Sequence, residues 1–280
     1  MNGSDLFKET TFHHACSLME DGRYAEALLL LHKLVTDGET GEEVLVCALS
    51  SALHTENWDL AKRYAEEIGR QQYEGKDALF WITDYYFGSG QEMLAQRNIS
   101  QIRQLYPADT CLLWDVAEML FDYEFRDQYE EILRQIAAVK TQDPLELLDQ
   151  ADAHLALNQL APAAQKAMEA ARNLASHERD DIYYAGLVLE QCGEAGKALQ
   201  VYEKWLADSP EDVEFLLATV RCHSALGQFD QAEHILEQAR QLQPDLPELG
   251  PAAKAVAQAR RKVIDFQMYR KRKHESGSQL

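Results

Sequence analysis

The chain has 280 residues, of which 46% are hydrophobic and 26% are charged, the balance of a globular protein with a substantial core. Asp and Glu (47) outnumber Lys and Arg (27), and the resulting formal net charge of −20 argues against a nucleic-acid-binding protein. The first residues show no secretory signal, no apolar run reaches the roughly 20 residues of a membrane helix, and the five cysteines fit no disulfide framework. We therefore expect a reduced, cytoplasmic protein.

A turn signal recurs along the chain at a nearly constant interval. Seven residues follow one another 34 positions apart, with a single step of 35: Gly22, Glu56, Gly90, Glu124, Asn158, Gly193 and Gly227. All but two are Gly or Asn, the residue types that end a helix and turn the chain. Five residues after each turn comes an alanine, with one exception: Ala27, Ala61, Ala95, Tyr129, Ala163, Ala198 and Ala232. The sequence thus predicts seven copies of one structural unit.

Each turn is expected to join two amphipathic helices. After the first turn, Ala27, Leu31 and Leu34 are spaced by four and three residues, which places them on one face of a helix, and the later copies repeat this spacing. Prolines stand where this second helix should end: Pro107, Pro210 and Pro244. Before the turns, small residues in matching phase let two helices approach closely: Ala15, Ala117, Ala151 and Gly186. The repeated unit is therefore a helix, a turn and a second helix.

This pattern resembles the tetratricopeptide repeat (TPR) family, whose 34-residue helix–turn–helix unit it matches over about residues 8–246, best in residues 179–212 and 213–246. The resemblance implies an all-α, right-handed helical-repeat solenoid of seven repeats over residues 1–247. Two departures stand out. Tyr129 replaces the alanine of the family, which predicts wider or bent packing in the fourth repeat, and one extra residue falls in the polar stretch 176–180.

The end of the chain has a different pattern. Residues 248–274 predict a capping helix with one apolar stripe and a basic end, Tyr269–His274, and residues 275–280 predict a disordered tail. Residues 251–280 carry a net charge of +6, which leaves −26 on the rest of the chain. Three roles for the basic end remain open: occupying the groove of the same or a second copy, contact with an acidic membrane or nucleic acid, or capping alone.

No catalytic constellation stands out in the sequence. It has no histidine pair at metal-ligand spacing, no phosphate-binding glycine loop and no nucleophile motif. Cys16, Cys47 and Cys222 fall within predicted helices, where small packing residues are expected. We therefore expect no enzymatic activity, no metal and no cofactor.

The resemblance also implies a binding surface. In TPR proteins the first helix of each repeat lines a concave groove through its second, fifth, ninth and twelfth positions. The candidate site residues at or beside these positions are Phe80, Asp84, Phe87, Trp114, Glu118, Phe121, Asp122, Leu148, Asp152 and Tyr183. Aromatic residues thus stand beside carboxylates. Such a groove repels the terminal carboxylate that chaperone-binding TPR proteins grip, and suits a basic-amphipathic segment.

The sequence therefore predicts a non-catalytic scaffold or adaptor that binds a basic-amphipathic segment of a protein partner. Two alternatives remain open: a chaperone or regulator that shields an apolar segment of a secreted or assembled protein, and the recruiting subunit of an enzyme complex. Core packing of Phe80 and Trp114 between neighbouring repeats is a competing explanation for the aromatic positions.

Overall fold

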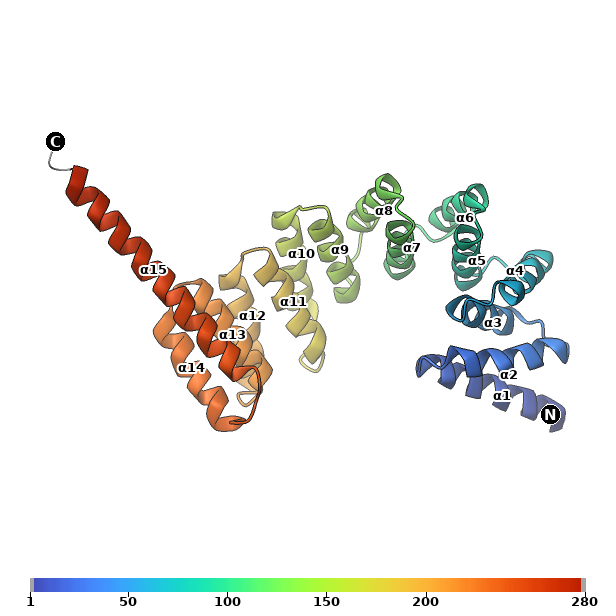
Figure 1. Ribbon diagram of the computed structural model, residues 1–280, viewed down its shortest axis with the longest axis horizontal. Coiled ribbons are helices and arrows are strands. Elements are labelled where there is room, and N and C mark those ends of the chain that lie inside the picture. The colour runs from blue at the N-terminus through green and yellow to red at the C-terminus, as the bar shows by residue number, and fades with distance from the viewer. Residues whose placement is uncertain (1–2, 278–280) are drawn as a thin grey trace. The chain divides into compact units, whose positions relative to one another are not determined.

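The computed structural model describes the backbone of residues 3–277 and the side chains of residues 7–263, and every element in this part of the chain is an α-helix (Figure 1). The fifteen helices of the described residues are α1 (Gly3–Glu20), α2 (Tyr24–Thr36), α3 (Glu42–His54), α4 (Trp58–Gln71), α5 (Lys76–Gly88), α6 (Glu92–Leu105), α7 (Thr110–Asp122), α8 (Arg126–Ala138), α9 (Pro144–Ala156), α10 (Leu160–Asn173), α11 (Arg179–Gln191), α12 (Ala195–Asp208), α13 (Val213–Ala225), α14 (Phe229–Leu242) and α15 (Leu249–Gly277). The expected all-α helical-repeat fold is confirmed.

The seven predicted turns join α1 to α2, α3 to α4 and so on to α14, each with three residues. The middle residue of every turn is left-handed, with φ between 54° and 77°. In the first turn the N–H of Gly22 donates to the carbonyl of Met19 (2.9 Å) and that of Arg23 to Leu18 (2.7 Å), the Schellman pair, and the other six turns repeat both bonds. The predicted helix ends are thus confirmed, Glu56 and Glu124 included.

The alanine at the fifth position after each turn lies at the contact between helices. All six are 0% exposed: Ala27, Ala61, Ala95, Ala163, Ala198 and Ala232. Tyr129 at the same position is half-buried, and its ring meets that of Phe121 edge-on at 5.3 Å. The small alanine side chain lets the second helix approach its neighbours closely. Because this contact recurs once in each repeat, the alanines recur with the same period as the turns.

Contacts divide the chain into two compact units, Met1–Ile132 and Leu133–Leu280, and the division falls within α8, the helix that contains Tyr129. In the first unit the first helices of the repeats form a layer in which α1 contacts α3, α3 contacts α5 and α5 contacts α7. Figure 1 shows α3, α5 and α7 on the inner side of this unit. In the second unit α9 contacts α11, and α13 contacts α15. Each unit thus presents a surface built from first helices.

The core follows the predicted small positions. Ala15, Ala117 and Ala151 are fully buried, and so is Gly186 in α11. A Cβ atom at Gly186 would lie only 2.2 Å from Cε1 of Tyr202, a fully buried residue of α12. Glycine is therefore required there by the close approach of the tyrosine ring.

Helix α15 covers the last repeat by packing on α13 and α14. Leu249 and Val256 are buried in this contact, and Arg260 pairs with Glu233 (2.8 Å) and Asp230 (2.6 Å) of α14. The helix continues to Gly277, three residues into the predicted tail. The remaining tail residues, and the side chains of the basic cluster Tyr269–His274, lie outside the described residues, so the predicted domain boundaries stay predictions.

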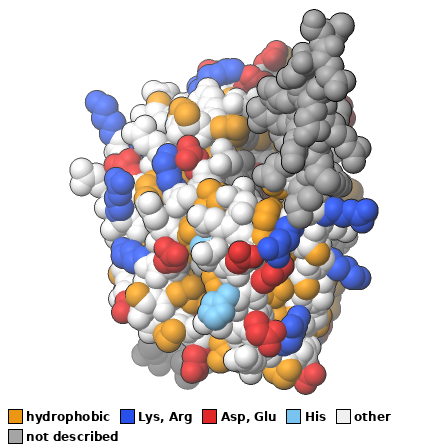
Figure 2. Space-filling view, turned by 90° about the vertical axis from the view of Figure 1, so that its left-hand side faces the viewer, with side chains coloured by type: hydrophobic (Ala, Val, Ile, Leu, Met, Phe, Trp, Pro, Cys, Tyr) orange, Lys and Arg blue, Asp and Glu red, His pale blue; other side chains and the backbone are white. Residues whose placement is uncertain are grey.

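The end face of the second unit carries hydrophobic side chains in small patches among basic and acidic ones (Figure 2). Within the helices that the structure describes, none has the length and apolar character needed to cross a membrane.

Candidate functional site

A groove lies between the middle of α1 and the starts of α3 and α5 in the first unit. Its volume is about 800 Å³. Apolar side chains form part of the lining: Phe12, Val44, Val46 and Cys47. Phe12 and Val46 occupy the fifth position of their repeats, which the TPR resemblance assigned to the concave surface. Acidic side chains form another part: Glu42, Glu43 and Asp77. The groove therefore combines an apolar floor with negative charge.

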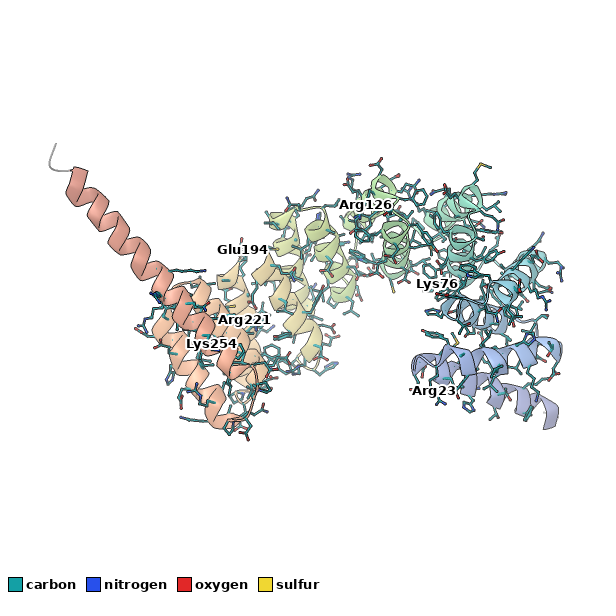
Figure 3. All side chains as sticks on the ribbon, viewed as in Figure 1. Arg23, Lys76, Arg126, Glu194, Arg221 and Lys254 are labelled. Atoms are coloured by element: carbon teal, nitrogen blue, oxygen red, sulfur yellow. The ribbon has the colours of Figure 1, made fainter. Side chains whose placement is uncertain are left out.

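The acidic side chains of this groove keep their charge available. Among the described residues no Lys, Arg or His forms an ion pair with Glu42, Glu43 or Asp77. The basic residue of the lining, Lys76 (Figure 3), pairs with Asp109 at 3.1 Å. Glu42 lies against the start of α5, where a Cβ at Gly75 would clash with its carboxylate. Glu43 and Asp77 are exposed and face solvent.

The candidate residues in the first unit differ in exposure. On α5, Phe80 and Asp84 are half-buried, whereas Phe87 is buried and stacks on Tyr123 at 4.8 Å. On α7, Trp114 is half-buried, and three residues are exposed: Glu118, Phe121 and Asp122. The guanidinium of Arg126 lies 3.9 Å from the centre of the Phe121 ring, so this exposed aromatic side chain already holds a cation.

Asp84 is engaged by the next repeat. The hydroxyl of Tyr123 donates a hydrogen bond to its Oδ1 at 3.1 Å. Burial raises the pKa of Asp84 above the usual range of an aspartate, although this hydrogen bond opposes the shift. Asp84 therefore links two repeats and contributes less free charge to the surface than its sequence position predicts.

The same arrangement recurs in the second unit. Leu148 of α9 is buried in the core, and Asp152 accepts a hydrogen bond from the hydroxyl of Tyr184 at 2.8 Å. Burial raises the pKa of Asp152 to about 6. Tyr183 of α11 is half-buried and lines a second groove of about 760 Å³ between α11, α13 and α15.

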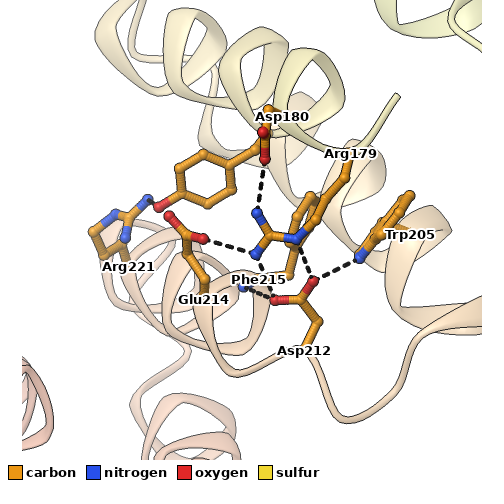
Figure 4. A network of polar contacts seen from close by, with 8 residues as sticks. Arg179, Asp180, Trp205, Asp212, Glu214, Phe215 and Arg221 are labelled. Atoms are coloured by element: carbon orange, nitrogen blue, oxygen red, sulfur yellow. Dashed lines mark hydrogen bonds and ion pairs between the residues drawn. The ribbon is translucent and has the colours of Figure 1, made fainter. Parts of the chain in front are cut away.

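Arginine residues neutralise carboxylates of this second groove (Figure 4). Arg179 donates to Asp212 from Nε (2.8 Å) and Nη2 (3.0 Å). Its Nη2 also donates to Glu214 (2.7 Å), and its Nη1 donates to Asp180 (2.9 Å). The indole of Trp205 donates to Asp212 at 3.0 Å. Burial opposes ionisation of Asp212, yet the bonds from Arg179 and Trp205 hold its pKa below the usual range. These acids therefore stabilise the stacking of repeats.

The two units differ in acidic residues that lie outside the predicted candidate set. Glu43 and Asp77 stand at the second position of their helices, and so do Asp180 and Glu214 in the second unit. The second pair is neutralised by Arg179, whereas the first pair has no basic partner among the described residues. The signal was present in the sequence, because the second position belongs to the concave pattern of the family. The partnering of Asp84 and Asp152 by tyrosines had no such signal.

The described side chains offer little for metal or nucleophilic chemistry. Within residues 7–263, His, Cys, Asp and Glu form no group of three or more that could hold a metal ion. Cys47 lines the first groove, but burial, Cys16 and nearby carboxylates raise its pKa to about 12, so the thiol is protonated at neutral pH.

Comparisons with known proteins agree with this architecture. Residues 191–258 match the family model of the tetratricopeptide repeat. The fold is similar to the C-terminal part of a TPR repeat-containing protein from Cytophaga hutchinsonii, with 13% sequence identity, coverage of 86% of this chain and 98% of that chain, and a TM-score of 0.55. It is also similar to PilW, a widely conserved type IV pilus biogenesis factor, with 12% identity, coverage of 88% and 98%, and a TM-score of 0.51.

A search of the curated proteins finds no significant match. The family match over residues 191–258 and the same helix pair repeated through both units show that the described helices have the fold of a tetratricopeptide repeat array.

Proposed function

We propose that the chain is a non-catalytic scaffold that binds a basic-amphipathic segment of a protein partner, and that the groove between α1, α3 and α5 is the main contact. The observation that carries the proposal is the pair Glu43 and Asp77. Both are exposed beside an apolar floor and have no basic partner among the described residues, whereas the equivalent acids of the second unit are neutralised by Arg179.

The energetics assign different roles to the two kinds of side chain. An exposed ion pair contributes about 0.2–1 kcal/mol, so the carboxylates mainly attract and select a basic partner. Burial of a Leu or Phe side chain contributes about 1.5–3 kcal/mol, so the apolar floor supplies most of the affinity. Phe80, Trp114, Glu118, Phe121 and Asp122 would extend the contact along α5 and α7, while Phe87 and Leu148 remain in the packing. The cytoplasmic location remains a prediction.

The test uses the full chain and a capped peptide in which Lys alternates with Leu and Phe. We expect saturable binding that weakens as salt is added, because exposed charges are screened. The variant Glu43→Gln/Asp77→Asn should weaken binding about two- to thirtyfold, the effect of losing two exposed pairs. The matched control is Asp59→Asn/Glu92→Gln, which removes two first-turn acids from the second helices α4 and α6.

Two results would contradict the proposal. Equal weakening by the groove variant and the control would mean that net charge alone attracts the peptide. An affinity that changes neither with salt nor in the groove variant would favour the alternative of a chaperone that shields an apolar segment.

A further inference from the structure

A separate pocket opens on the second helices of the second unit. Its volume is about 240 Å³, and it lies between α10 and α12 beside the linker of residues 174–178. This linker has five residues, whereas the linkers that follow the other 14-residue helices joining two repeats, α4, α6 and α12, have four. The extra residue predicted between the fifth and sixth repeats therefore lies at this pocket.

The wall of the pocket is apolar and fixed. It is formed by Met168, Ala171, Leu174, Ile182, Val201 and Trp205. Ala171, Leu174 and Val201 are buried residues of the packing. The Trp205 ring stacks on Phe215 at 5.2 Å and its Nε1 donates to Asp212, so two interactions hold the largest wall residue in place. A ligand would therefore enter a site that needs little rearrangement.

The size of the pocket fits one large side chain. A protein cavity of roughly 150 Å³ accommodates a benzene molecule. A volume of about 240 Å³ thus has room for the ring of Phe or Trp with its first carbon, but is small for a cofactor or a whole peptide.

The rim of the pocket has a charge opposite to that of the protein. Arg172 and Lys204 are exposed on α10 and α12, and no carboxylate of the described residues lies within ion-pair distance of either. Asp208 is the single acidic residue of the lining, so the charged groups around the opening sum to positive. A segment with carboxylates on both sides of an aromatic residue would be attracted here and repelled by the acidic groove of the first unit.

We propose that this pocket is a second protein-binding site, which takes an aromatic side chain from an acidic segment of a partner while Arg172 and Lys204 pair with the flanking carboxylates. The site is independent of the proposed groove, because it lies on second helices of the other unit and selects the opposite charge. The chain would then join two partners of opposite charge.

Trp205 provides a direct reporter for the test. The probe is a capped pentapeptide with Phe at its centre and two Asp on each side, titrated into the full chain labelled with ¹⁵N. The indole N–H signal of Trp205 is assigned by its loss in Trp205→Phe. We expect this signal to shift saturably, while the indole signals of Trp58, Trp81 and Trp114 in the first unit stay unchanged.

Matched probes and variants separate the two parts of the proposal. Replacing Phe by Ala in the probe should remove the shift, and replacing each Asp by Lys should do the same. Arg172→Gln/Lys204→Gln should weaken binding about two- to thirtyfold, whereas Lys197→Gln, on the same helix but outside the pocket, should not. An unchanged Trp205 signal at the highest concentration of the acidic Phe probe, or equal shifts with the Lys or Ala probe, would overturn the proposal.

Discussion

Gly186 permits a quantitative test of how closely α11 and α12 pack. In Gly186→Ala the new Cβ would lie 2.2 Å from Cε1 and 2.4 Å from Cζ of Tyr202. The ring is fully buried and its hydroxyl donates to Glu190 at 2.8 Å, so it has little freedom to move. Overpacking of this kind costs about 1–3 kcal/mol, and such short contacts indicate the upper end. Ala stabilises a helix by about 1 kcal/mol relative to Gly. We therefore expect a net loss of about 2 kcal/mol.

The sign of the effect should reverse when the ring is absent. In a Tyr202→Leu background the atoms that clash are gone, so Gly186→Ala should stabilise by up to about 1 kcal/mol. The measurement is hydrogen exchange of the α11 and α12 amides, because repeat arrays open locally. Gly69→Ala in α4, where a Cβ would meet nothing within 4 Å, is the control and should be neutral or stabilising. Additive effects of the two changes would refute the close packing as the cause.

Three further outcomes are expected. Glu56→Gly should raise the free energy of unfolding by about 0.5–1 kcal/mol. It removes the steric cost of a left-handed glutamate, and the added freedom of the unfolded chain offsets part of this gain. Glu56→Ala keeps the steric cost and should not raise the free energy of unfolding. Because the pKa of Asp152 is raised to about 6, the folded state binds this proton more tightly than the unfolded state, and the protein becomes more stable as pH falls below about 6. Asp152→Asn removes the buried charge, so it should raise Tm near pH 7. Near about pH 4 the carboxyl of the folded protein is already protonated, and the variant should have no such effect. Arg179→Met should lower the free energy of unfolding, measured with denaturant, by about 2 kcal/mol, because Asp212 loses its partner. An equal loss in Arg240→Met, which removes an exposed arginine, would contradict this role of Arg179.

The architecture could be predicted because its determinants are local. A left-handed residue at a helix end and an alanine five positions later depend on a few neighbouring residues, so Gly22 and Ala27 mark the repeat wherever they recur. Even Glu56 and Glu124 adopt the turn, since the Schellman bonds of the flanking helix impose it.

The candidate site was less predictable because partners come from other repeats. The sequence places Asp84 and Asp152 on a surface position but gives no sign that Tyr123 and Tyr184 reach them from the next helix. Aromatic positions were ambiguous for the same reason. Phe87 becomes buried once Tyr123 stacks on it, whereas Phe121 stays exposed.

The first residue of each inner helix has a consequence for how such arrays diversify. Arg179 begins α11 and reaches the acids of two successive repeats, whereas Glu42 begins α3 beside Glu43 and Asp77. A change to arginine at such a position would pair the acids of the proposed groove as Arg179 pairs those of the second unit, and its loss would do the reverse. The charge that a surface of this array presents to solvent can therefore change during evolution while the helices, the turns and the repeat length stay the same.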